Sequence, residues 1–144
     1  MRKNPAYSLV ELIVVIGIIA ILAVPGILGV YAIRSKQALR TSAETLSAVL
    51  KRAHIYAREG RGQASWEVEY LDNKSFELRS NDGVTEKVEA MYVLSAPTEF
   101  DSGYFLIRFD QGVGTTKTPM TIILKTNPRN EVAQVSVSTN GVVE

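Results

Sequence analysis

Residues 12–33 read LIVVIGIIAILAVPGILGVYAI, and this stretch decides the fold because it contains no charged residue. A helix rises ~1.5 Å per residue, so the stretch reaches roughly 33 Å, about the thickness of a hydrocarbon layer. It therefore predicts a helix that spans a membrane or lies in the apolar core of an assembly. Pro25 and Gly26 predict a kink or a local break near the exit of this helix.

One carboxylate, Glu11, stands directly before the apolar stretch. A charged side chain costs about 2.5–3.5 kcal/mol at the centre of a bilayer, so this acid needs a partner inside the apolar layer. Arg2 and Lys3 precede it, and basic residues on that side stay cytoplasmic, which predicts that most of the chain lies outside the cytoplasm. The alternative is an ordinary secretory signal or signal anchor, which would gain nothing from an acid at its edge.

Length and composition allow one such helix and one small globular domain. The chain has 144 residues, 46% of them hydrophobic, which leaves room for little more. It contains no cysteine, so an exported domain has to rely on its own core and on its neighbours for stability.

The helix is expected to continue as an amphipathic helix over residues 34–61. Apolar residues recur there at steps of three and four, which predicts one stripe packed on a sheet. The stripe consists of Leu39, Ala43, Leu46, Val49, Leu50, Ala53 and Tyr56. Gly60 and Gly62 are expected to end the helix.

The remaining residues, 62–144, are typical of short strands joined by turns. Apolar and acidic residues alternate over 66–70, and turn signals follow at 72–74 and 81–83. Further strands are expected around residues 76–78, 90–94, 104–109, 120–125 and 132–138. A run of hairpins after one long helix predicts an α+β fold, in which the helix packs on an antiparallel sheet.

The first residues also resemble the class III signal of type IV prepilins. The resemblance rests on Ala6-Tyr7-Ser8-Leu9-Val10-Glu11 followed by the apolar stretch. It implies that a prepilin peptidase removes a leader of residues 1–6 by cutting between Ala6 and Tyr7, and that the new amine of Tyr7 is methylated. It further implies a pilin fold, a filament-core or membrane helix over residues 7–33, and a role for Glu11 in subunit assembly. Members of the family usually have glycine where Ala6 stands and phenylalanine where Tyr7 stands.

Three further segments are similar to the GspH/FimT group of minor pilins and pseudopilins. They are the helix end at 46–60, the turn Phe109-Asp110-Gln111-Gly112 and the closing strand at 135–143. The resemblance implies a place at or near the tip of a filament for type II secretion, a type IV pilus or DNA uptake. It implies as partners homologous pilin or pseudopilin subunits, the prepilin peptidase and an inner-membrane assembly platform. The implied location is the inner membrane, crossed once with the head outside the cytoplasm, and then the filament.

Enzymatic, cofactor and metal chemistry has little support in the sequence. Residues 112–118 resemble a phosphate loop, but Thr116 stands where glycine is needed before Lys117, and a strand pattern follows. His54 is the only histidine, so it is interpreted as a surface or packing residue. Asp101, Ser102 and Asp110 match no calcium-ligand spacing. We expect no enzyme, no cofactor and no metal site.

Three functions remain from this reasoning. The first is a structural filament subunit held by helix packing and by Glu11. The second is a tip subunit that captures DNA, with Lys117, Lys125 and Arg129 as the candidate cluster, although residues 62–144 carry a net charge of −5. The third is a membrane-anchored periplasmic domain unrelated to filaments.

Residues 34–61 carry a net charge of +5, opposite in sign to that of residues 62–144. This difference favours attraction between helices and heads of adjacent subunits, or is an incidental property of a solvated helix face.

Overall fold

A computed structural model describes residues 8–144, apart from the side chains of residues 23–28. The chain divides into two compact units, Met1–Arg34 and Ser35–Glu144. The predicted leader and the predicted cleavage site at Ala6 and Tyr7 lie outside the described residues.

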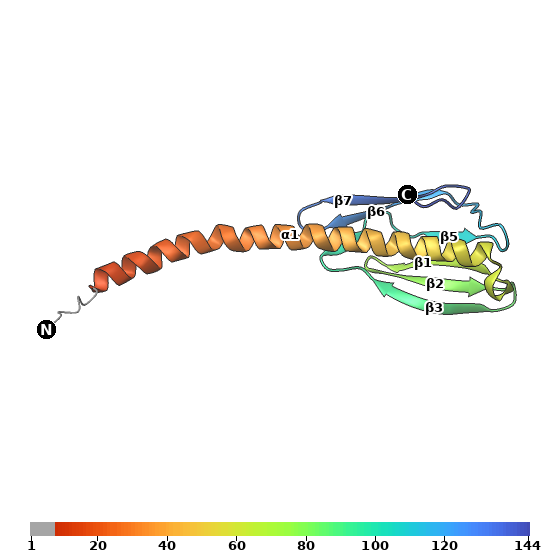
Figure 1. Cartoon of the computed structure of the whole chain (residues 1–144), viewed down its shortest axis with the longest axis horizontal. Helices are drawn as coiled ribbons and strands as arrows, with labels where there is room; N and C mark the ends of the chain where they lie inside the picture. The colour runs from red at the N-terminus through yellow and green to blue at the C-terminus, as the bar shows by residue number, and fades with distance from the viewer. Residues whose placement is uncertain (1–7) are drawn as a thin grey trace. The chain divides into compact units, whose positions relative to one another are not determined.

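The α-helix α1 runs without interruption from Leu9 to Arg58 (Figure 1). It passes through Pro25 without a break, so the predicted interruption at that residue is wrong. Proline removes one backbone donor, and the helical conformation continues in the turns on both sides of it. Within the described part of the chain, no helix combines the length and the apolar character that crossing a membrane requires. The membrane span predicted for residues 7–33 is not confirmed.

Glycine ends the helix, as predicted. Gly60 adopts a left-handed conformation with φ 64°, which is the usual way to terminate an α-helix. A short 3₁₀ helix, η1 (Arg61–Gln63), follows and leads into the first strand. The helix therefore stops at Arg58, slightly before the predicted limit of residue 61.

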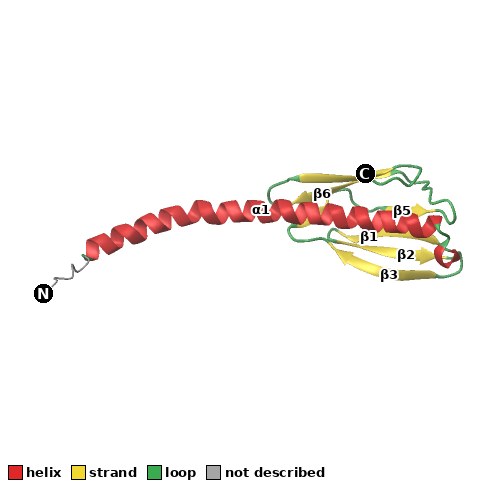
Figure 2. Ribbon diagram, in the orientation of Figure 1, coloured by secondary structure: helices red, strands yellow, loops and turns green. Residues whose placement is uncertain are grey.

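Among residues 8–144, seven strands form two antiparallel sheets instead of the single sheet predicted (Figure 2). The larger sheet has the order β3-β2-β1-β5 and the smaller has the order β4-β6-β7. The strands are β1 (Ser65–Asp72), β2 (Ser75–Asn81), β3 (Glu86–Val93), β4 (Thr98–Phe100), β5 (Leu106–Phe109), β6 (Met120–Thr126) and β7 (Val132–Val137). The sequence did not predict β4, because three residues are too short to show an alternating pattern.

The core of the second unit lies between α1 and both sheets, whose strands run alongside the C-terminal half of the helix (Figure 1). The predicted helical stripe is confirmed, since Leu39, Leu46, Val49, Leu50 and Ala53 are buried and Ala43 and Tyr56 pack against the same cluster. The strands contribute buried aromatic and branched side chains: Val68, Phe76, Ile107, Phe109, Ile122 and Leu124. The α+β arrangement of a helix packed on antiparallel sheets is therefore confirmed.

Candidate functional site

The first turn of α1 is capped by a side chain. Ser8 precedes the helix, and its Oγ accepts a hydrogen bond from the backbone N–H of Glu11 at 3.2 Å. This is the serine half of the Ser-x-x-Glu capping arrangement. Glu11 thus lies in the first helical turn, where a carboxylate also interacts favourably with the positive end of the helix dipole.

The helix around Glu11 exposes apolar side chains on every face. From Leu9, which is 74% exposed, to Leu22, which is 66% exposed, each large hydrophobic residue remains accessible. These residues are Leu9, Val10, Leu12, Ile13, Val14, Val15, Ile16, Ile18, Ile19, Ile21 and Leu22. A helix that is hydrophobic all round is normally covered in its working state, by lipid or by other helices. Glu11 is therefore a carboxylate at the edge of a surface that another apolar phase has to cover.

The structure describes one of the three site residues predicted from the sequence. Glu11 lies in the described helix, whereas Ala6 and Tyr7 lie outside the described residues. Sequence reasoning missed the role of Ser8, although serine three residues before glutamate, at the start of an apolar run, is the standard signal of a capped helix.

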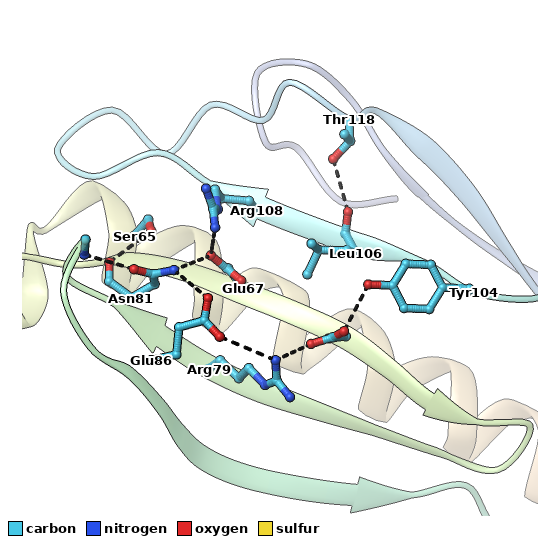
Figure 3. A network of polar contacts seen from close by, with 11 residues as sticks. Ser65, Glu67, Arg79, Asn81, Glu86, Tyr104, Leu106, Arg108 and Thr118 are labelled. Atoms are coloured by element: carbon cyan, nitrogen blue, oxygen red, sulfur yellow. Dashed lines mark hydrogen bonds and ion pairs between the residues drawn. The ribbon is translucent and has the colours of Figure 1, made fainter.

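A polar network covers the outer face of the larger sheet (Figure 3). Glu67 is 2% exposed, and its Oε1 accepts a hydrogen bond from Nε of Arg108 at 2.6 Å. Asn81 Nδ2 lies 3.4 Å from the same oxygen. The hydroxyl of Tyr104 donates to Glu69 Oε1 at 2.9 Å, and this hydrogen bond raises the pKa of Tyr104.

The same network continues across β2. Arg79 pairs with Glu69 and with Glu77, and its Nη1 lies 3.9 Å from Glu86. Glu77 is only 3% exposed, and its buried charge is compensated by the guanidinium group of Arg79. These carboxylates are neutralised by guanidinium groups, which offset the cost of removing the carboxylate charges from water.

The structure does not bring the candidate DNA-binding residues together. Lys117 precedes β6 and Lys125 lies near its end, so the strand from Met120 to Lys125, roughly 17 Å long at ~3.4 Å per residue, lies between them. Lys125 also pairs with Asp101, and this hydrogen bond raises the pKa of Lys125. The predicted cluster with Arg129 is therefore divided between the two ends of one strand.

Other residues singled out in the sequence have structural roles. His54 is partly buried, its Nδ1 lies 2.9 Å from the carbonyl oxygen of Gly114, and its ring meets Phe109 edge-on, so its interpretation as a packing residue is confirmed. The segment resembling a phosphate loop leads into β6, as its pattern predicted. Ser102 hydrogen-bonds the backbone of Ile123. Among the residues that the structure describes, no group of three or more histidine or acidic residues is arranged to hold a metal ion.

Comparison with known protein families finds a match at the N-terminus of the chain. Residues 1–27 match the family model of the prokaryotic N-terminal methylation motif. No curated protein and no solved structure matches the chain. The match covers the predicted leader, Glu11 and the first part of α1, and such a signal implies processing by a prepilin peptidase and assembly with other pilin subunits. This chain therefore carries a prepilin-type signal, the N-terminal methylation motif of prokaryotes, at residues 1–27.

Proposed function

We propose that this chain is a structural subunit, without enzymatic activity, of a type IV pilus or type II secretion filament. Within that class we assign it to the minor pilins or pseudopilins of the GspH/FimT type. The observation that carries the proposal is the position of Glu11, a carboxylate in the first turn of a helix whose described side chains up to Leu22 expose apolar groups on every face. The methylation motif at residues 1–27 supports the same conclusion.

The chemistry of assembly follows from this position. Removal of a leader after Ala6 would create an amine on Tyr7, two residues before the start of α1. A cation there meets the positive end of the helix dipole and becomes costly once an apolar core surrounds it. Glu11 of a neighbouring subunit is placed to neutralise that amine, which removes the desolvation penalty of both groups together.

The proposed location and partners follow from the same reasoning. Before assembly, the apolar half of α1 would hold the chain in the inner membrane, with the head outside the cytoplasm as Arg2 and Lys3 indicate. In the filament, the same surface would pack against homologous subunits. The partners that this route requires are the prepilin peptidase and an inner-membrane assembly platform.

The decisive experiment is the intact mass and N-terminal sequence of the protein recovered from membranes of cells with and without a prepilin peptidase. We expect a chain that starts at methylated Tyr7 only when the peptidase is present. A chain that still starts at Met1 in both strains, or that is cut well beyond Ile33, would contradict the proposal and favour an anchored or secreted domain.

A substitution at the cleavage site provides the matched control. Ala6→Leu places a bulky side chain where the peptidase family accepts a small one, so processing should stop in the strain that contains the enzyme. Ala6→Gly restores the usual residue of the family and should be cut at least as well as the natural chain. Equal processing of both variants would show that cleavage occurs elsewhere.

A further inference from the structure

A groove of about 700 Å³ lies between the end of α1 and the larger sheet. Trp66, Leu78 and Ala90 line it from β1, β2 and β3, and Arg52 and Arg61 line it from α1 and η1. Its volume is within the range of ligand-binding clefts, ~300–1,000 Å³. We call it the Arg52–Arg61 groove.

Each of the two arginines of the groove contacts a tyrosine side chain, and neither forms an ion pair within the described residues. Arg52 Nη1 donates to the hydroxyl of Tyr92 at 3.1 Å, and the guanidinium carbon of Arg61 lies 4.2 Å from the ring centroid of Tyr56. Both guanidiniums are thus held in place by aromatic groups and keep donors for a carboxylate or another planar anion.

The acidic residues of the groove already have partners. Glu89 pairs with Lys87 at 3.0 Å, and this hydrogen bond lowers the pKa of Glu89, with a smaller contribution from the charge of Arg61. Asp82 Oδ1 accepts the backbone N–H groups of Val84 and Thr85 at 2.8 and 2.7 Å, within the turn between β2 and β3. The groove is thus lined by three cations, Arg52, Arg61 and Lys87, against the two acids Asp82 and Glu89, and this balance favours an anionic ligand.

The strand beside the groove has a free edge. β3 pairs with β2 and is the outermost strand of its sheet (Figure 1). Val88, Met91 and Val93 of this strand are 51%, 63% and 69% exposed. An edge strand with exposed apolar side chains is a template for pairing with another extended chain.

The groove and the row of exposed apolar side chains, Val88, Met91 and Val93, lie on opposite faces of β3. Tyr92 pairs with the buried Phe76 and faces the groove, whereas Met91 pairs with Glu77, which belongs to the polar face. A strand added along β3 would place alternate side chains over the groove and over the exposed apolar row. The groove favours acidic side chains and the apolar row favours aliphatic ones.

We propose that the β3 edge and the Arg52–Arg61 groove form a docking site for an extended acidic segment of a partner protein, which adds as a further strand. Its acidic side chains pair with Arg52 and Arg61, and its aliphatic side chains cover Val88, Met91 and Val93. The site lies wholly within the second unit, Ser35–Glu144, and its existence does not depend on the proposed filament function.

The test measures binding of a fluorescein-labelled peptide of alternating glutamate and valine to the full chain in detergent micelles, by fluorescence anisotropy. We expect saturable binding, which is lost when lysine replaces each glutamate. The same peptide with N-methylated alternate backbone nitrogens should also fail to bind, because it cannot donate hydrogen bonds to the edge of β3. Equal binding of the N-methylated peptide, or no binding of the glutamate–valine peptide, overturns the proposal.

Variants of the protein locate the site. Arg52→Gln together with Arg61→Gln should weaken binding by about tenfold or more, the loss expected for a charge-assisted contact worth ~1.4 kcal/mol. Met91→Lys should weaken it independently. Arg58→Gln removes a positive charge from the same end of α1 outside the groove and should leave binding unchanged. Unfolding curves that match the natural chain establish that the variants are folded.

Two other occupants would give distinct results. Tighter binding of oligothymidine than of the acidic peptide, with loss in the arginine variant, would assign the groove to single-stranded nucleic acid and overturn the proposal. The chain could instead self-associate in a way that excludes the peptide and disappears with Met91→Lys. That result would assign the β3 edge to a second copy of the chain and would also overturn the proposal.

Discussion

Arg108 places Nε 2.6 Å and Nη2 2.5 Å from the same oxygen of Glu67, across the pairing of β5 with β1. The Glu67 side chain is 3% exposed, whereas the Arg108 side chain is 50% exposed. Trp66 and Val68 on either side of Glu67 point into the core, so the alternation of the strand directs this carboxylate to the outer face. Arg108 thus covers and neutralises the Glu67 carboxylate, which lies on the outer face of the sheet because Trp66 and Val68 occupy the core face.

Removal of Arg108 should destabilise the head more than a surface ion pair would suggest. Arg108→Ala leaves the buried carboxylate of Glu67 with one weak partner, Asn81, at a cost of about 1–3 kcal/mol in the free energy of unfolding. Urea unfolding followed by fluorescence of Trp66, the only tryptophan, measures the change.

Two controls separate the buried charge from lost packing. Adding Glu67→Gln to Arg108→Ala removes the uncompensated charge and should restore part of the loss. Arg40→Ala breaks an exposed pair with Glu44 and should change the free energy of unfolding far less than Arg108→Ala, because an exposed ion pair is screened by solvent. A double variant no more stable than Arg108→Ala alone would assign the loss to packing.

Gly141 should tolerate no side chain, because a Cβ there would overlap His54 Nδ1 and the carbonyl oxygen of Gly114. Its φ of +76° adds a left-handed backbone cost of about 1–2 kcal/mol. We expect Gly141→Ala to lower the free energy of unfolding by that amount plus an overpacking cost of about 1–3 kcal/mol.

Gly112 provides the matched comparison for Gly141. It has the same φ of +76°, but an added Cβ meets nothing within 4 Å. Gly112→Ala should therefore show the backbone cost alone. Equal losses for the two alanine variants in urea unfolding would mean that the turn at Gly141 moves away from His54.

The sequence predicted the helix and most strands because their patterns are local. Leu46 and Leu50 recur with the helical period, and both are fully buried as expected. The number of sheets was not predictable in this way, because it depends on which distant strands pair, such as β4 with β6. Glu67 illustrates the same limit, since a glutamate in an alternating strand predicts exposure, and only its pairing with Arg108 from β5 buries it.

The candidate site was predictable in part. Glu11 stood out because it is the carboxylate directly before a long apolar stretch, and Ser8 could have been found from its spacing. The Arg52–Arg61 groove was not predictable, because its residues come from α1, η1 and three strands that meet only in the folded chain.

The turn between β2 and β3 should make stability depend on acid pH. Hydrogen bonds from the Thr85 and Val84 N–H groups lower the pKa of Asp82. A carboxylate with a depressed folded pKa contributes its full stability above its unfolded pKa of about 4 and loses it as the pH falls further. Asp82→Asn keeps an accepting oxygen but cannot titrate, so it should lose less stability than the natural chain between about pH 5 and pH 3 in urea unfolding. Identical losses would place the titration elsewhere.

Glu11 gives the sharpest prediction for assembly. Glu11→Gln keeps the size of the side chain and removes the charge, so processing and membrane insertion should remain while incorporation into filaments falls. The proposed reason is that the amine of a neighbouring Tyr7 then enters the apolar core without a counter-charge. The measurement compares immunoblots of the sheared filament fraction and the membrane fraction.

Two further variants distinguish loss of the Glu11 charge from loss of helix stability and from loss of an acidic residue elsewhere. Ser8→Ala removes the cap of α1, at a cost of about 1 kcal/mol to the helix, and leaves the carboxylate of Glu11 in place. Glu59→Gln removes an acid beyond the end of α1. Both should enter filaments normally. If Ser8→Ala were excluded as strongly as Glu11→Gln, order in the first turn would explain the defect, and normal incorporation of Glu11→Gln would rule out pairing with the amine.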